Sequence, residues 1–443
     1  MNTNEKYHLE KVCTLNPWNH PIHDYSVSHI LRVGDRVFLS TADCLTDREG
    51  MCNVYPMLYE KRGDGEWKLV FSEESSYQMD AGQLIYQGNN RLVMTLNPPK
   101  DRYPKDYYTW LVPCTPVIYL FDIAEGVKLI DKFDIPWDRN DYPFKSHNYR
   151  SSGVDIVNGN LLCTNIHYPA EEFAYSLMDA RCRPIRLGKL EFPYRVCYHN
   201  IAMRDGETYL FGVQDVIEPN EEWRNYQKQM SDFLYVFRTV HLNYSPDITK
   251  EELRPSVVIC SKEETCGQIE NLDCAFTRDG QMIFMAGERQ FMNEIMRDHF
   301  FPGMSNFSEL CFYRLSKGEV IERVVMDRTE EGDEWNLSHN GFIHTAANGE
   351  LYLVWSKIAE KGDGLFKIAF YIKSVDEPNQ KPYLIFEHVG VKSTHMSNRI
   401  DGSKASHGAT PSDLVEIYWV EGDMDCMYAC FDLKDMATES MQE

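Results

Sequence analysis

The segment NIAMRDGETYLFGV (residues 200–213) consists of an apolar strand, the polar turn Asp205-Gly206 and a second, more hydrophobic strand. An Asp-Gly pair between two apolar runs is a strong local signal for a β-hairpin, because the turn requires positive φ angles. Segments of the same layout begin at six other positions: His29, Gly82, Gly153, Cys274, Gly341 and Gly408. The chain is therefore predicted to contain seven such hairpins.

The spacing of these hairpins indicates a closed ring. Their turns centre on Gly34, Gly88, Gly159, Gly206, Gly280, Gly349 and Asp413, so that successive turns lie 47 to 74 residues apart. If the C-terminus is placed next to the N-terminus, the distance from Asp413 around to Gly34 is 64 residues, which is one further period. A ring of sheets closes in this way, whereas an open array need not.

Each hairpin is followed by a second strand pair, such as MLYEKRGDGEWKLVFSE from Met57. The seventh copy has only MYACFDL from Met427, and an orphan strand, YHLEKVCTL, lies at residues 7–15. An unpaired edge strand is a liability, so we expect the orphan to pair with the last copy. The prediction is an all-β fold: one domain, residues 1–443, forming a seven-bladed β-propeller of four-stranded antiparallel blades, with the N-terminal strand closing the last blade.

Composition narrows the possible partners. The formal net charge of −23 argues against non-specific binding to nucleic acid or to anionic lipid, both of which need a basic surface. The N-terminus MNTNEKYHLE has no apolar signal core, and no stretch approaches a membrane span. Thirteen cysteines, mostly inside predicted strands, are typical of buried thiols in a reducing compartment, so we expect a cytoplasmic protein. The oligomeric state is left open.

Candidate site residues lie where the inner strand of each predicted blade begins, at the mouth of the central channel. Four of the 14 histidines fall there, namely His29, His199, His339 and His407. Convergent imidazoles suit general acid/base chemistry or a site for Zn, Mn or Fe(II). The alternative is that these polar side chains only hold ordered water in a wet channel. No cofactor is required by the sequence, although a divalent metal on these four histidines is possible.

Other residues at this level can bind a substrate or move protons. SHNYRSSG supplies His147, Tyr149 and Arg150, and EFPYRVCYHN supplies Arg195. Arginine binds a carboxylate through two hydrogen bonds, and tyrosine or histidine transfers protons. The acidic candidates are Asp80, Glu270 and Asp273, two of which would allow a glycosidase mechanism if they lay roughly 5 to 10 Å apart.

Long loops that connect second and third strands also favour a sugar ligand. LNPPKDRYPKDYYTW from Leu96 and the loop from Gln214 are rich in aromatic and charged residues. Aromatic faces pack on the C–H faces of a sugar, and its hydroxyls need polar partners. We include Trp335, which precedes the sixth inner strand, among the substrate-binding candidates for the same reason.

The segments RGDGEWKLV and HNYRSSGVDIVNGNLLCTNIHYP (residues 147–169) resemble the BNR-repeat, sialidase-like propellers, a superfamily with polysaccharide lyase and glycosidase branches. The resemblance implies a carbohydrate-active enzyme. In the lyase branch a histidine or tyrosine abstracts a proton beside a uronate whose charge is neutralised by arginine or histidine. By motif match, His147, Tyr149, Arg150 and His167 would be the counterparts, with His199 nearby. The chain lacks the Asp-box and the Phe-Arg-Ile-Pro segment of true sialidases, so an arginine triad for sialic acid is not expected.

These observations lead to one expected function and two alternatives. We expect an enzyme that cleaves an oligosaccharide, by hydrolysis or β-elimination, at the channel mouth. His199 and His339 are the expected acid/base groups, Tyr149 the proton donor, and Arg150 and Arg195 the anchors; His29, His407, Asp80, Asp273 and Glu270 complete the candidate site. The alternatives are a non-catalytic propeller that binds a protein or glycan partner, and a His-ligated metalloenzyme.

Overall fold

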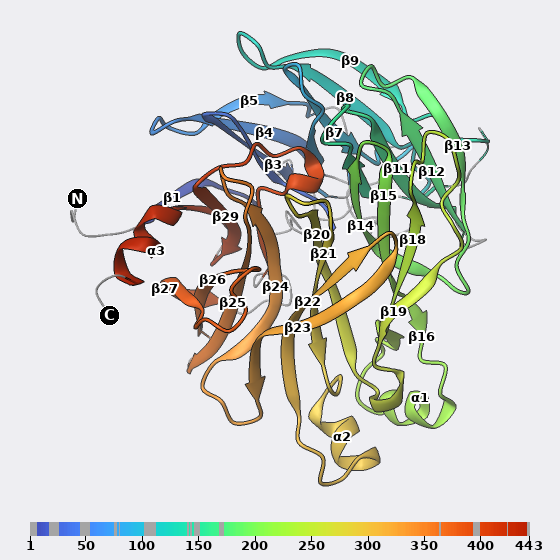
Figure 1. Cartoon of the computed structure of the whole chain (residues 1–443), viewed down its shortest axis with the longest axis vertical. Coiled ribbons are helices and arrows are strands. Elements are labelled where there is room, and N and C mark those ends of the chain that lie inside the picture. Colours follow the sequence, from blue (N-terminus) through green and yellow to red (C-terminus); the bar gives the residue numbers. More distant parts are fainter. Residues whose placement is uncertain are drawn as a thin grey trace.

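Seven four-stranded antiparallel sheets are arranged around a central axis in the computed structural model, which confirms the predicted β-propeller (Figure 1). The inner strands contact one another in sequence around the axis, and the last of them also contacts the first, so the ring is closed. The structure describes residues 7–16, 26–44, 54–74, 78, 80–101, 112–139, 141, 144–145, 151–167, 172–362, 365–392, 399–422 and 424–440.

The strands of each blade are given from the axis outwards. Blade 1 consists of β2 (Ile30–Val33), β3 (Arg36–Cys44), β4 (Val54–Arg62) and β5 (Lys68–Ser72), and blade 2 consists of β6 (Gln83–Tyr86), β7 (Arg91–Leu96), β8 (Val117–Asp122) and β9 (Lys128–Asp134). Blade 3 consists of β10 (Ser151–Val154), β11 (Leu161–His167), β12 (Glu172–Met178) and β13 (Pro184–Leu190). The fourth blade consists of β14 (Val196–Arg204), β15 (Glu207–Gln214), β18 (Thr239–Ser245) and β19 (Val257–Ser261).

Blade 5 consists of β20 (Gln268–Phe276), β21 (Met282–Arg289), β22 (Phe307–Ser316) and β23 (Glu319–Glu330), and blade 6 consists of β24 (Asn336–Thr345), β25 (Leu351–Gly362), β26 (Leu365–Ser374) and β27 (Tyr383–Lys392). Blade 7 consists of β28 (Ile400–Gly402), β29 (Leu414–Glu421), β30 (Asp425–Asp432) and β1 (Tyr7–Thr14). The remaining elements are the ribbon β16 (Val216–Ile217) and β17 (Tyr235–Val236), the helices α1 (Glu221–Gln227), α2 (Glu294–Phe300) and α3 (Leu433–Ser440), and the 3₁₀ turns η1 (Glu263–Thr265) and η2 (Ala405–His407).

The N-terminal strand closes the seventh blade, as predicted. β1 pairs antiparallel with β30, with Tyr7 opposite Phe431 and Cys13 opposite Cys426. Aromatic side chains fill the spaces between neighbouring blades; the rings of Phe211 and Phe284, for example, stack with centroids 4.4 Å apart. No helix among the described residues is long and apolar enough to cross a membrane.

The seventh hairpin differs from its prediction. Its first strand was expected from Gly408, but the inner strand is β28, and residues 403–413 leave the sheet as a plug that contains η2. η2 contacts the inner strands β6, β10, β14, β20 and β24, so the plug crosses the axis. Gly408 has φ +84°, and a Cβ atom there would lie 2.1 Å from the carbonyl oxygen of Tyr86. This close approach, rather than strand formation, explains the glycine.

Buried polar groups hold neighbouring blades together near the axis. The backbone N–H of Ile343 in blade 6 donates to Oδ2 of Asp273 in blade 5 at 2.8 Å. The N–H of His29 in blade 1 donates to Oδ2 of Asp401 in blade 7 at 2.6 Å. Nδ2 of Asn200 in blade 4 donates to the Asn271 side chain of blade 5 at 2.6 Å. These hydrogen bonds satisfy backbone and side-chain groups that burial would otherwise leave unpaired.

Asp273 gives a prediction about the pH dependence of stability. Burial raises its pKa to about 6, above its usual value of 3.8. A carboxyl whose pKa is raised on folding contributes most stability below its unfolded pKa and loses that contribution as the pH rises through its folded pKa. We therefore expect wild type to lose, relative to Asp273→Asn, on the order of 2 kcal/mol of unfolding free energy between pH 4 and pH 7. Urea denaturation of both proteins across this range checks the prediction; a constant difference would contradict it.

Candidate functional site

Three of the predicted catalytic and binding residues, His147, Tyr149 and Arg150, lie outside the described residues. His167 ends β11, where its backbone pairs opposite Glu172, and its side chain is outside the described part of the chain. These predictions therefore stay predictions. The other candidates can be placed.

His339 lies between blades 5 and 6, at the end of the propeller where the inner strands begin, which we call the entrance face. It belongs to a bulge in β24, where the register shifts between Leu337 and Gly341, and it has φ +55°. A Cβ atom at Gly287 of β21 would lie only 2.7 Å from Nδ1 of His339. Glycine at 287 thus makes the space that the imidazole occupies.

The imidazole of His339 is buried without hydrogen bonds. Its relative exposure is 3%, and neither Nδ1 nor Nε2 has a hydrogen-bond partner among the described residues. Burial, with a smaller effect from the charge of Arg289, holds its pKa well below 6.5. An unpaired buried polar group and a left-handed backbone both destabilise a fold, and together they are typical of functional sites.

Three polar side chains share this seam with His339. Glu270 of β20 lies directly opposite Gly287, and Gln268 lies opposite Arg289, so all four positions are on one face of the blade 5 sheet. Nε2 of Gln268 donates to Oε1 of Glu270 at 2.5 Å. Nε of Arg289 is buried and has no partner within the described part of the chain. We call His339, Arg289, Glu270 and Gln268 the seam site.

The seam site combines a neutral imidazole, a guanidinium with an unused donor and a carboxylate held by an amide. The imidazole can accept a proton, and the guanidinium can bind an anionic group of a ligand. Of the four residues, the sequence analysis identified His339 and Glu270 and missed Arg289 and Gln268. A glycine inside a predicted strand marks a close approach, so Gly287 was the available signal for Arg289, two residues further on.

His199 lies in a different seam, between blades 3 and 4. Its Nδ1 is 3.1 Å from Oγ1 of Thr164, and its ring packs at a centroid distance of 4.2 Å on Phe173 and 5.6 Å on Phe192. Burial lowers its pKa to about 3. His199 and His339 therefore face separate surroundings, although they occupy similar positions in the repeat.

His29 and His407 lie near the axis, and hydrogen bonds engage both. Nδ1 of His29 is 3.3 Å from Oδ2 of Asp401. His407 lies on η2 of the plug rather than at the start of an inner strand; its Nε2 is 2.6 Å from Nε2 of Gln83 and its Nδ1 is 3.0 Å from Oγ of Ser406. Within the described residues, the four histidines do not gather into a group with metal-ligand spacing.

The remaining predicted residues have surroundings of their own. Arg195 forms an ion pair with Asp215 at 2.9 Å and lies 4.8 Å from the ring centroid of Tyr235, so its guanidinium is engaged within blade 4. Asp273 bridges blades 5 and 6 as described above, and Asp80 is buried just before the second inner strand. Trp335 is partly exposed immediately before β24.

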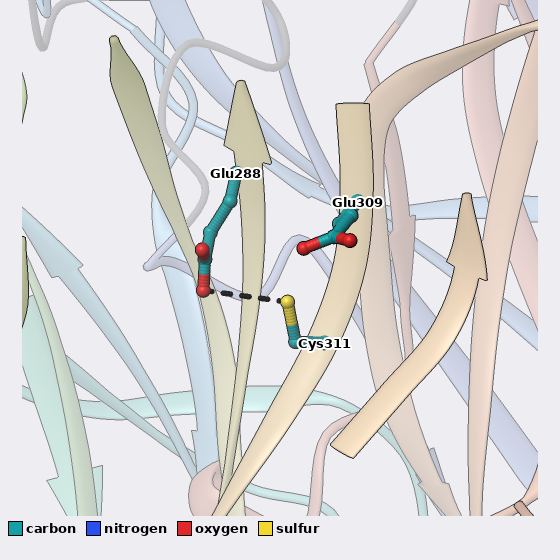
Figure 2. Close-up of side chains that lie close together, drawn as sticks. All are labelled: Glu288, Glu309 and Cys311. Atoms are coloured by element: carbon teal, nitrogen blue, oxygen red, sulfur yellow. Dashed lines mark hydrogen bonds between the residues drawn. The ribbon is translucent and has the colours of Figure 1, made fainter. Parts of the chain in front are cut away.

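A group of potential metal ligands lies elsewhere, on blade 5. Oxygen and sulfur atoms of Glu288, Glu309 and Cys311 all lie within 4.8 Å of one another (Figure 2). Nη2 of Arg323 contacts all three residues, at 2.9 Å from Oε2 of Glu288, 2.6 Å from Oε2 of Glu309 and 3.0 Å from Sγ of Cys311. A guanidinium thus neutralises the two carboxylates that a cation would need. Although burial acts to raise the pKa of Glu288, hydrogen bonds and charges of Arg323 and Lys262 lower it to about 2.

A cavity opens on the opposite end of the propeller, which we call the turn face because the tight turns of the inner hairpins lie there. Its volume is about 510 Å³, and its lining includes Tyr86, Asn158, Phe276 and Ser406. Asp155 is the charged residue in the lining. Its carboxylate accepts five N–H hydrogen bonds, which come from the backbone of Val157, Asn158, Asp205 and Gly206 and from the side chain of Asn158. The sequence analysis placed ligands on the entrance face and missed this cavity.

Comparisons with known proteins find distant structural similarities. No family model matches the chain, and no curated protein matches it. Among solved structures it is similar to an exo-β-1,3-galactanase from Phanerochaete chrysosporium, with 10% identity, 96% of each chain covered and a TM-score of 0.37. An α-L-arabinanase from Penicillium chrysogenum shows 11% identity over 79% of this chain and 94% of that chain, with a TM-score of 0.41. A lignostilbene dioxygenase from Pseudomonas brassicacearum shows 11% identity over 98% and 91%, with a TM-score of 0.47.

Arg323 gives a prediction about stability. Replacing it with methionine leaves the buried carboxylates of Glu288 and Glu309 without their shared partner. Because Arg323 itself is 33% exposed, the loss is smaller than the several kcal/mol that breaking a fully buried ion pair costs. We expect Arg323→Met to lower the free energy of unfolding by about 2 kcal/mol. Arg328→Met is the matched control, because Arg328 pairs with the same Glu309 but, within the described residues, forms no ion pair with the buried Glu288. Arg328 is 43% exposed, and its replacement should cost less than about 1 kcal/mol. Equal effects of the two substitutions, measured by urea denaturation, would contradict this account.

Proposed function

We propose that the chain is a carbohydrate-active enzyme that cleaves a uronate-containing oligosaccharide by β-elimination at the seam site. The observation that carries the proposal is His339, a buried imidazole with neither nitrogen hydrogen-bonded among the described residues, beside a guanidinium whose buried Nε has no partner there. A base and an anion-binding group side by side are what removal of a proton next to a carboxylate requires.

Each residue has a role in this reaction. Arg289 binds the uronate carboxylate and stabilises the negative charge that develops when the neighbouring C5 proton leaves. His339 accepts that proton, the C4–O bond then breaks, and a double bond forms between C4 and C5. The departing oxygen needs a proton, and Tyr149 remains the candidate donor predicted from the sequence. Glu270, held by Gln268, would hydrogen-bond to sugar hydroxyls.

The charge of the substrate would activate the base. Burial, and to a smaller extent the positive charge of Arg289, keep the pKa of His339 well below 6.5, so the imidazole is neutral and able to accept a proton at pH 7. A carboxylate bound to Arg289 cancels part of that positive charge and raises the basicity of His339. A neutral sugar would leave the basicity unchanged. The site therefore favours uronates.

Elimination fits the described residues better than hydrolysis. A glycosidase generally needs two carboxyl groups that flank the scissile bond. Both oxygens of Asp273 accept hydrogen bonds from backbone N–H groups, those of Cys274 and Ile343. Both oxygens of Asp401 do the same with the N–H groups of Gly402 and His29. These two carboxylates join blades, which leaves Glu270 as the carboxylate of the seam site.

Replacing His339 with glutamine tests this proposal. His339→Gln removes the base, so the elimination rate should fall at least about 100-fold, while the melting temperature should change little because the imidazole has no hydrogen bond to lose. The substrates are oligosaccharides with and without uronates; absorbance of the unsaturated product reports elimination, and new reducing ends report any cleavage.

The matched control is His344→Gln. His344 is a buried histidine at the other end of the same strand, with Nε2 2.7 Å from the carbonyl oxygen of Ser412, so its replacement should leave elimination unchanged. Undiminished elimination by His339→Gln would contradict the proposal, as would cleavage of neutral oligosaccharides at the same rate as uronates.

The turn-face cavity favours a second candidate function, a non-catalytic propeller that binds a neutral glycan. Its volume is in the range of small-molecule sites, aromatic rings of Tyr86 and Phe276 line it, and five hydrogen bonds engage its one charged lining residue, Asp155. Such a lining suits an uncharged polyhydroxylated ligand.

A rim substitution separates the two functions. Val157 lines the cavity and is 61% exposed, so Val157→Trp can obstruct the opening without disturbing the core. If the cavity binds neutral mono- or disaccharides, calorimetric titration should show an affinity at least about tenfold weaker in this variant, with elimination of uronates unchanged. Absence of binding by wild type, or binding that Val157→Trp leaves intact, would reject this second function.

A further inference from the structure

Two free cysteines face each other where the ring closes. Cys13 of β1 and Cys426 of β30 occupy directly opposite positions in the pairing of the N-terminal strand with the last blade. In the registers of the described strands, no other cysteine lies opposite a second cysteine. The pair therefore differs from the other cysteines of the described strands, which lie opposite other residue types.

The geometry of the pair is compatible with a disulfide. Directly opposite residues of antiparallel strands have Cα atoms about 4.5 to 5.5 Å apart, and disulfides span Cα distances of about 4.4 to 6.8 Å. Bond formation therefore needs only side-chain rotation. A register shift between Lys11 and Cys13 brings the two cysteines opposite each other, because without this bulge Val12 would face Cys426.

The surroundings distinguish the two thiols. Cys426 is fully buried, with Sγ 3.3 Å from Oη of Tyr418 and 4.0 Å from Oγ1 of Thr41. Cys13 is partly exposed, so a reagent in solution can reach it. A hydrogen bond from Cys426, and a weaker one from Tyr59, lower the pKa of Cys13, whereas burial raises that of Cys426. Cys13 is thus the thiol that ionises first and attacks a disulfide.

We propose that Cys13 and Cys426 form a reversible disulfide by exchange with a small disulfide such as oxidised glutathione, and that this bond locks the N-terminal strand onto the last blade. The Cys13 thiolate attacks one sulfur of oxidised glutathione, which forms a mixed disulfide and releases one glutathione thiolate. Cys426 then loses its proton and attacks the sulfur of Cys13, which releases the second glutathione. Two protein thiols are oxidised, and one glutathione disulfide is reduced to two thiols.

The lock would act on the contact that keeps the ring closed. Cys13 and Cys426 belong to an apolar cluster with Ile30 and Leu39 of blade 1 and Tyr418 of blade 7. A covalent bond here joins the two ends of the ring and restricts the unfolded chain over a long loop. The oxidised protein should therefore resist opening at the junction of blades 7 and 1.

Treatment of the full chain with oxidised glutathione, followed by mass spectrometry, tests the proposal. The intact mass should fall by two hydrogens without a retained glutathione, and a digest without reductant should contain the tryptic peptide 12–32 joined to 405–434. The second peptide also contains Cys430, so the joined peptides alone do not show which cysteine is bonded to Cys13. The same experiment on Cys430→Ala identifies this cysteine, because the variant should still form the Cys13–Cys426 disulfide. Oxidation should raise the melting temperature of wild type and of Cys430→Ala by at least about 5 °C, and dithiothreitol should reverse the change.

Cys13→Ser and Cys426→Ala should show neither the mass change nor the thermal shift. The proposal is overturned if wild type retains both thiols or stops at a glutathione adduct on Cys13. It is also overturned if the joined peptides disappear in Cys430→Ala, or if the bond forms without any thermal shift. The measurement on wild type decides the question even where a variant folds poorly.

Discussion

The pairing of β1 with β30 is the constraint on which the structure depends. This contact pairs the N-terminal strand with the last blade, and it gives the seventh blade its fourth strand. Because the ring is closed, groups distant in sequence meet near the axis: the N–H of His29 reaches the carboxylate of Asp401, and Arg32 reaches Glu416. The positions of the inner strands, and with them the seams between blades, follow from closure.

The buried polar groups discussed above differ in whether they have hydrogen-bond partners, and this difference indicates the candidate site. Asp273, Asp401 and Asn200 bond across seams and so stabilise the ring. His339 is equally buried, yet neither ring nitrogen has a partner in the described structure, and its backbone is left-handed. A fold tolerates such a group only when other interactions compensate for it. Its neighbour Arg289 is the cation on which the proposed binding of an anionic sugar rests, and Glu270 lies on the same face of the sheet.

The sequence predicted most of the fold because turn residues and strand alternation are local signals. Six of the seven hairpins lie where their turns indicated, but the seventh failed because its inner strand, β28, has only three residues and is followed by the plug. The histidines show the limit of positional reasoning. β14 and β24 carry bulges of different size, which contain His199 and His339 respectively. Each extra residue redirects the side chains, so equal repeat positions do not converge. Arg289 was missed because its proximity to His339 depends on a neighbouring blade.

The central claim is that the seam between blades 5 and 6 binds a uronate. The most direct measurement is a crystal structure of His339→Gln, which should be inactive but otherwise unchanged, soaked with a uronate-containing tetrasaccharide. The account predicts a sugar carboxylate hydrogen-bonded to Arg289, with C5 of that sugar facing the side chain at position 339. Saccharide bound only in the turn-face cavity, or a seam site that remains empty at saturating ligand, would contradict it.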